Sequence, residues 1–110
     1  MKTVKKVWGR EEWIVNNDLY CFKKLFLNKG YQCSYHCHKI KDETFIIKHG
    51  KVIIELDGMD FNLVPGDSIR IKPDQYHRFT GVTDAVIYEV STTHREEDSY
   101  RKTKSGRVKW

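Results

Sequence analysis

The grouping of apolar residues restricts the fold of this chain more than any other feature. They alternate with polar residues or form short blocks, such as Val52-Ile53-Ile54, and turn residues follow the blocks. Alternation with a period of two is typical of β-strands, and the three- to four-residue spacing of an amphipathic helix is nearly absent. The sequence therefore predicts an all-β protein.

Turn residues divide the chain into six expected strands. Turn signals about every eight to twelve residues favour a sandwich or a barrel over alternating strands and helices. The expected strands cover residues 20–27, 32–38, 44–48, 51–56, 68–72 and 85–91. The sequence thus predicts a barrel core at 19–91, and the pattern leaves the N-terminal segment, residues 1–18, undecided.

The length and the charge distribution indicate one small domain with a basic tail. At 110 residues the chain has the length of a single domain, which we place at 1–100. The chain has 20 Lys and Arg against 15 Asp and Glu, and five of the basic residues lie in the last ten positions, which hold no acid. We expect this tail, 101–110, to be loosely held. The charges of the rest balance, which argues against a nucleic-acid-binding surface.

The sequence also lacks signs of membrane insertion and export. Its apolar runs are far shorter than the roughly 20 residues that span a bilayer, and no apolar signal-peptide region follows the basic start. Three cysteines, Cys21, Cys33 and Cys37, cannot pair completely, so we expect reduced thiols. These features predict a cytoplasmic protein that is not bound to a membrane.

Four residues form a candidate metal site: His36, His38, Glu43 and His77. Side chains alternate along a strand, so His36 and His38 face one side and Cys37 faces the other. Glu43 starts the next strand, where antiparallel pairing would bring its carboxylate beside the imidazoles. Three imidazoles and one carboxylate suit one divalent ion, such as zinc, iron, manganese, nickel or cobalt.

The spacing of the first three ligands resembles the first motif of the cupin superfamily. Gly30 is followed after five residues by His36 and after one more by His38, and then come four residues, Glu43, six residues and Gly50. This spacing matches every fixed position of that motif. The resemblance implies a double-stranded β-helix, that is, a jelly-roll barrel with one metal ion inside.

The second cupin motif is matched in part. Gly66 and His77 have the right separation, whereas Lys72 and Asp74 replace the proline and the glycine of the motif, and Gly81 stands where an Asn is usual. These replacements change the turn and keep the metal ligand.

Nearly the whole chain resembles the small cupins of the type II phosphomannose isomerase group. The group often has Gln where this chain has His36, and Arg where it has Lys41, which binds phosphate without the bidentate fork of Arg. Related small cupins act on free sugars such as lyxose. The resemblance rests on Trp8-Gly9, Lys23-Lys24, Ser34-Tyr35-His36, His38, Lys41, Glu43, Gly66-Asp67-Ser68-Ile69, His77-Arg78-Phe79, Glu89-Val90-Ser91-Thr92-Thr93 and Glu97-Asp98.

The resemblance implies an aldose–ketose isomerase acting on a small sugar or sugar phosphate. For the proton carrier we name Glu89 and Glu43, and for stabilising the enediolate or anchoring phosphate we name Lys24 and Lys41. Alternation turns one of Lys23 and Lys24 inward, and the sequence leaves open which.

Two other functions fit the same ligand set. One is an iron-dependent cupin dioxygenase, and the other is a non-catalytic sugar-binding module. Cupins usually pair through their sheets, so the resemblance also implies a homodimer. We expect His49 and His94, which lack partners at motif spacing, to be packing residues and not ligands.

Overall fold

Every regular element in the computed structural model, which describes residues 1–109, is a strand. The fold is therefore all-β, as the sequence predicts. The strands are β1 (Lys2–Lys6), β2 (Gly9–Asn16), β3 (Cys21–Leu27), β4 (Tyr31–Gln32), β5 (His36–Cys37), β6 (Glu43–His49), β7 (Val52–Leu56), β8 (Met59–Leu63), β9 (Ser68–Ile71), β10 (His77–Gly81), β11 (Ala85–Ser91), β12 (Tyr100–Arg101) and β13 (Gly106–Arg107).

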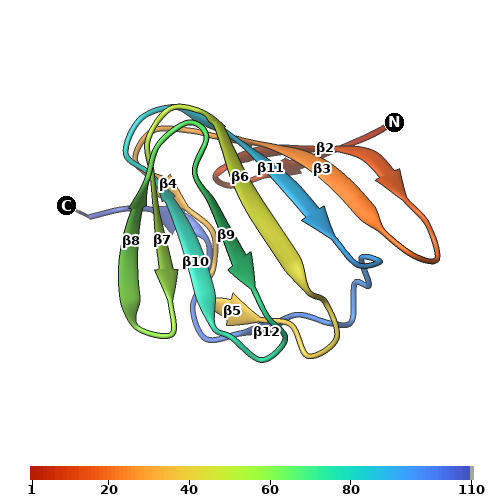
Figure 1. The fold of residues 1–110 in the computed structure, drawn as a ribbon. Coiled ribbons are helices and arrows are strands. Elements are labelled where there is room, and N and C mark those ends of the chain that lie inside the picture. The colour runs from red at the N-terminus through yellow and green to blue at the C-terminus, as the bar shows by residue number, and fades with distance from the viewer. Residues whose placement is uncertain (110) are drawn as a thin grey trace.

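The strands form two antiparallel sheets. The first has the order β1-β2-β3-β11-β6-β9, and the second has the order β12-β5-β10-β4-β13, with β7 paired to β10 and β8 paired to β7. Figure 1 shows β2, β3, β11 and β6 side by side, with β7, β8 and β10 in the other layer. This jelly roll confirms the expected architecture.

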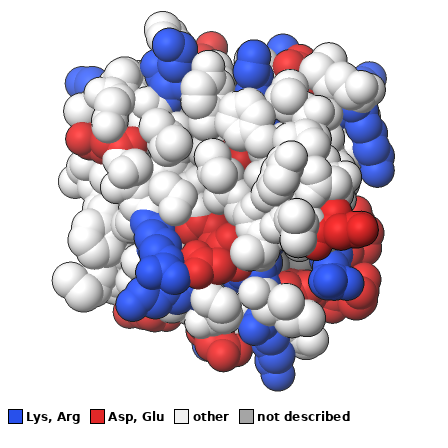
Figure 2. Space-filling model, turned by 45° about the vertical axis from the view of Figure 1, so that its right-hand side comes forward, with Lys and Arg blue, Asp and Glu red and all other residues white. Residues whose placement is uncertain are grey.

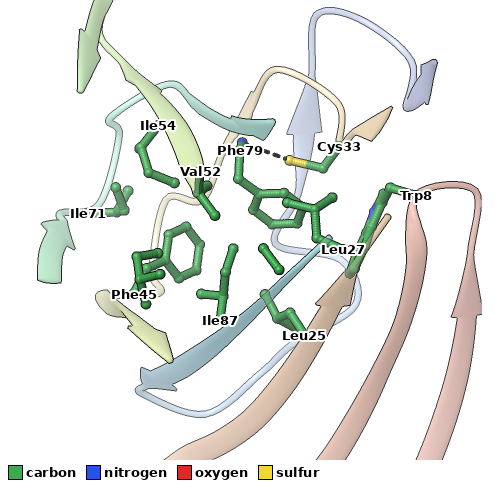
Figure 3. Close-up of a cluster of buried hydrophobic side chains, with 12 residues drawn as sticks. Trp8, Leu25, Leu27, Cys33, Phe45, Val52, Ile54, Ile71, Phe79 and Ile87 are labelled. Atoms are coloured by element: carbon green, nitrogen blue, oxygen red, sulfur yellow. Dashed lines mark hydrogen bonds between the residues drawn. The ribbon is translucent and has the colours of Figure 1, made fainter. Parts of the chain in front are cut away.

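The apolar core lies between the two sheets. Alternation gives β3 and β11 a row of buried side chains on one face, and these pack against buried residues of the second sheet. Figure 3 shows aromatic and aliphatic residues of both sheets pointing toward one another. The core consists of Trp8, Leu25, Leu27, Cys33, Phe45, Ile47, Val52, Ile54, Ile71, Phe79, Ala85 and Ile87.

A glycine turn connects the two layers between β6 and β7. Gly50 has φ 81°, a conformation that side chains with a Cβ rarely adopt. A Cβ at this position would also overlap the backbone carbonyl oxygen of Asp84. The turn that begins the return toward β10 therefore requires glycine.

The expected strand at 32–38 is divided, which corrects the sequence prediction. Between β4 and β5 the backbone N–H of Ser34 donates to Ser105 Oγ at 3.0 Å, and that of Tyr35 donates to Thr103 Oγ1 at 2.8 Å. Because side-chain hydroxyls accept these hydrogen bonds in place of a neighbouring strand, the ladder is interrupted.

The C-terminal segment is part of the second sheet. β12 pairs with β5 and β13 pairs with β4, and the backbone N–H of Val108 donates to Gly30 O at 2.7 Å. The expectation of a loosely held tail is therefore wrong for this segment, and position 110 of the expected tail lies outside the described residues. The undecided N-terminal segment forms the β1–β2 hairpin at the edge of the first sheet.

Charges are mixed on the surface shown in Figure 2. Basic and acidic side chains are interspersed there, without a broad area of one sign. Residues 1–109 contain no helix long and apolar enough to cross a membrane.

Candidate metal centre

The structure brings the three predicted histidines together. His36 on β5 lies opposite His77 on β10 in the antiparallel register, and His38 follows β5. One nitrogen of each ring lies within 4.8 Å of one nitrogen of the other two rings. Cys37 does not line the cavity that His36 and His38 line, as strand alternation predicts. The three side chains are thus arranged to hold one ion.

Glu43 joins this group from the first position of β6. Its Oε2 lies 3.2 Å from His38 Nε2 and 3.3 Å from His77 Nε2. The residue is 2% exposed, and His77 is 1% exposed. All four predicted ligands therefore converge, and two of the histidines, His38 and His77, face the same oxygen of Glu43.

Backbone carbonyls orient all three imidazoles. The Nδ1–H of His36 donates to Ser34 O at 2.7 Å, that of His38 to Asp98 O at 2.7 Å, and that of His77 to Gln75 O at 3.0 Å. A carbonyl only accepts, so each Nδ1 carries a proton, and in the neutral ring Nε2 then presents its lone pair. Such partners commonly fix the tautomer of a metal-binding histidine.

Two polar atoms at the centre of the cluster have no hydrogen-bond partner within residues 1–109. They are Glu43 Oε2 and His77 Nε2, both buried and 3.3 Å apart. With Nδ1 protonated, both atoms present lone pairs, so they cannot satisfy each other. Buried polar atoms without partners are costly, and a cation between them would satisfy both. The donor set therefore fits a divalent metal ion.

Electrostatics favour the metal-binding protonation states of His36 and Glu43. Burial and repulsion by His77 lower the pKa of His36 to about 3, so its ring is neutral at physiological pH. Burial alone would raise the pKa of Glu43, but opposing charges, that of Lys41 first among them, hold it well below its usual value. Neutral imidazoles and an ionised carboxylate are the forms that bind metals.

A buried ion pair lies beside the histidine cluster. Lys41 Nζ lies 2.7 Å from Glu89 Oε2 and 3.8 Å from Glu43 Oε1, and both Lys41 and Glu89 are 4% exposed. Burial would lower the pKa of Lys41, but the charges of Glu89 and Glu43 raise it instead. The structure thus brings three of the four predicted catalytic residues into one cluster.

Lys24, the fourth predicted catalytic residue, does not reach the cavity. It lies on the opposite face of β3, with its Nζ 6.0 Å from the ring of Tyr88. Lys23 is the inward lysine and is 1% exposed. Its Nζ lies 3.0 Å from His94 Nδ1 and 3.9 Å from the Trp13 ring centroid. Because side chains alternate along a strand, one of the two adjacent lysines had to face inward. The register of β3 in the sheet decides that it is Lys23.

One cavity of about 270 Å³, close to the lower end of the size of small-molecule sites, is lined by Lys23, His36, His38, Lys41, Glu43 and Glu89. Sequence reasoning assigned Trp13 and His94 no role at a site, yet both line this cavity. No motif marks them, because β2 and the loop after β11 bring them to the site from distant positions. Asp98 was noticed only as part of the family resemblance, and its contact with His38 depends on the path of the C-terminal segment.

Comparisons with known proteins agree with this geometry. A family model described as "Cupin domain" matches residues 25–91. A D-lyxose/D-mannose isomerase from Thermosediminibacter oceani is 27% identical, over 77% of this chain and 62% of the relative. The chain thus spans less than two thirds of the length of this curated relative.

Solved structures share the fold at low sequence identity. A variant of Streptomyces PAC13, solved with uridine, superposes with a TM-score of 0.81 at 11% identity, over 98% of this chain and 86% of that one. KdgF from Halomonas sp. gives a TM-score of 0.75 at 17% identity, over 80% of this chain and 81% of that one. At these identities the similarities show the shared fold alone.

Proposed function

The chain belongs to the cupin family, and we propose that it is a metal-dependent isomerase of a small sugar or sugar phosphate. The observation that carries the proposal is the position of the Lys41–Glu89 pair beside the candidate metal ligands, in the cavity that His36, His38 and Glu43 also line. The 27% identical relative, named as an isomerase of D-lyxose and D-mannose, supports the same reaction class.

In this proposal His36, His38, Glu43 and His77 hold the ion. All four are buried or partly buried, and their facing atoms are the lone-pair atoms described above. A divalent ion held there would polarise a sugar carbonyl and so ease removal of a proton from the neighbouring carbon.

Glu89 is the proposed proton carrier. Aldose–ketose isomerisation moves one hydrogen from C2 to C1 and one from O2 to O1, so it needs no oxidant or reductant. Glu89 takes the proton from C2 and returns it to C1, while the Lys41 ammonium, 2.7 Å away, balances the carboxylate charge. Glu43 faces the histidines with one oxygen, so we assign it to the metal instead of to proton transfer.

Lys23 takes the role that the sequence suggested for Lys24. Its ammonium lies in the cavity wall, and its register partner on β11 is Glu89. In this position Lys23 can donate hydrogen bonds to substrate oxygens that become negatively charged during the reaction.

The first test is the metal content of gently purified protein, measured by elemental mass spectrometry. We expect about one divalent ion per chain in the wild type, and less than a tenth of that in His38→Ala and His77→Ala variants that still fold. The identity of the ion also matters, because iron together with oxygen uptake would favour the dioxygenase function.

The second test follows the hydrogen at C2. Metal-loaded protein is incubated in heavy water with mannose, lyxose, glucose and their phosphates, and deuterium incorporation is measured by NMR. Exchange at C2 that is lost in Glu89→Gln supports the isomerase. Saturable sugar binding without exchange would reject it in favour of a sugar-binding module.

A further inference from the structure

The C-terminal segment passes directly beside the strand that carries the first histidines. In the β5–β12 pairing, Tyr100 lies opposite Cys37 and Arg101 lies opposite His36. Asp98 precedes β12 and is 3% exposed, so its carboxylate is buried against the connection from β5 to β6. This contact comes from outside residues 25–91, the part of the chain that matches the family.

The carboxylate of Asp98 accepts hydrogen bonds from three consecutive backbone N–H groups. Oδ1 accepts from Lys39 at 2.8 Å, and Oδ2 accepts from Lys41 at 2.9 Å. The N–H of Ile40 lies 3.2 Å from both oxygens. The connection has no strand partner of its own at these positions, so Asp98 supplies the acceptors that a neighbouring strand would supply in a sheet.

The backbone of Asp98 contacts His38, the residue that precedes Lys39. Its carbonyl accepts the Nδ1–H of His38 at 2.7 Å, and its own N–H donates to Arg95 O at 3.1 Å. Asp98 thus contacts each of the four residues from His38 to Lys41. The two ends of this stretch carry side chains of the site: His38 Nε2 faces Glu43, and Lys41 Nζ faces Glu89.

We propose that Asp98 is the positioning residue of the site, which fixes the His38 ring and the Lys41 ammonium through one set of hydrogen bonds. The inference rests on the proposed function for the roles of those two side chains. The hydrogen bonds of Asp98 do not depend on the proposed function, because they form without metal and without substrate. Groups that orient a metal-binding histidine commonly change metal affinity by about 10- to 100-fold when they are removed.

The first measurement is amide hydrogen exchange of the metal-free wild-type protein by NMR. The N–H groups of Lys39, Ile40 and Lys41 lie in a turn, yet we expect them to exchange as slowly as strand amides. In Asp98→Ala they should exchange at least about tenfold faster. Fast exchange of these three amides in the wild type would overturn the proposal even if no variant folds.

The second measurement concerns the metal. Asp98→Ala keeps the backbone carbonyl that accepts from His38 but loses the carboxylate that holds this carbonyl against the connection from β5 to β6. We therefore expect Co²⁺ to bind about 10- to 100-fold more weakly, with a changed visible absorption spectrum. Asp98→Asn should lie between Ala and wild type, since the amide keeps one acceptor and places an NH₂ against an N–H. Glu97→Gln, an exposed neighbouring acid, is the matched control and should behave as wild type.

The outcomes separate this inference from the proposed isomerase. Folded Asp98→Ala and Asp98→Asn proteins with wild-type Co²⁺ affinity and spectrum would overturn the positioning role. Slow amide exchange and Asp98-dependent Co²⁺ binding in a protein that never exchanges the hydrogen at C2 would support the positioning role and reject only the isomerase.

Discussion

The inner face of the first sheet is divided into an apolar part and an ionic part that are equally buried. On β3 the buried residues Lys23 and Leu25 are two positions apart, and on β11 the buried residues Glu89 and Ile87 are two positions apart. Glu89 is 4% exposed and Ile87 is 0% exposed. Burial therefore does not distinguish the two parts, although only the apolar part gains the roughly 1.5 to 3 kcal/mol that burial of a large aliphatic side chain contributes.

The boundary between the two parts is one step of the strand register. Lys23 pairs with Glu89, and the next inward pair is Leu25 with Ile87. Buried ion pairs are weak contributors to stability, because desolvation of the charges offsets their attraction. A fold that needed only stability would continue the apolar pairs to the end of the barrel, so the ionic residues indicate function.

The largest expected effect comes from breaking one half of the ion pair. Glu89→Leu leaves the Lys41 ammonium buried with Glu43 as its nearest carboxylate at 3.8 Å. We expect this variant to lose about 3 to 5 kcal/mol of unfolding free energy, measured by urea denaturation. The double variant Lys41→Met/Glu89→Leu should recover most of that loss while the proposed isomerase activity stays absent.

The double variant tests whether the Lys41–Glu89 ion pair itself stabilises the barrel. Replacing both charges by apolar side chains of similar size is commonly neutral or stabilising. A double variant as unstable as the single one would show that the ion pair itself stabilises the barrel, and the functional explanation of the ionic part would lose its main support.

Truncation of a buried side chain in the apolar part should give the next largest loss of unfolding free energy. Ile87 is completely buried in the core cluster, so Ile87→Ala removes apolar contacts and leaves a cavity. We expect a loss of about 2 to 5 kcal/mol of unfolding free energy. Co²⁺ affinity at the histidine cluster should stay within about twofold of wild type, and a larger change would mean that the two parts are coupled.

The sequence predicts the two parts unequally well. Strands with strict alternation or β-branched residues, such as β7 and β11, were expected within a residue or two of their bounds. β8 and β10 were not expected: β8 is mostly exposed, and β10 mixes polar and apolar residues without strict alternation. Their pairing with β7 holds them in the sheet, and that is a tertiary effect.

The site shows the same limit. The motif spacing predicted the four candidate ligands. The expected pairing of the Glu43 strand with the His36–His38 strand is wrong, because β6 belongs to the first sheet and β5 to the second, so Glu43 faces the histidines from the opposite sheet. Local spacing could not choose between Lys23 and Lys24, since a shift of one residue exchanges the two faces of a strand. It also gave Asp98 no role, because that residue reaches the site from 57 positions beyond Lys41.

Substitution of Lys23 and Lys24, which lie on opposite faces of β3, compares the ionic part with the outer face of the same strand. Lys23→Met removes the ammonium from the cavity wall, and Lys24→Met changes the opposite face of the same strand. If Lys23 donates to a substrate oxygen, its loss should weaken substrate turnover about 10- to 100-fold, since hydrogen bonds to charged groups contribute about 1.5 to 3 kcal/mol. Lys24→Met should leave turnover unchanged, and equal effects of the two variants would remove Lys23 from the site.

The smallest expected effect concerns the histidine that borders the ionic part. Burial and the positive charges of Lys23 and Lys41 lower the pKa of His94. The Lys23 ammonium also donates to His94 Nδ1 at 3.0 Å, a hydrogen bond that requires the neutral ring. The unfolded chain therefore takes up this proton more readily than the folded one, so the contribution of His94 to stability is complete above about pH 6.5 and is lost as the pH falls.

Between about pH 6.5 and 5, before the carboxylates take up protons, His94→Gln should flatten the fall in unfolding free energy of the metal-free protein. The change in slope corresponds to less than one bound proton, because a single group titrates over this range. Some slope remains in the variant, because His36, with its pKa lowered to about 3, contributes in the same direction. Urea denaturation in the presence of a chelator at several pH values measures the slope.

His49→Gln, at an exposed histidine, is the control and should keep the wild-type slope. An unchanged slope in His94→Gln would mean that Lys23 does not depend on a neutral His94, and that the ionic part ends at Lys23.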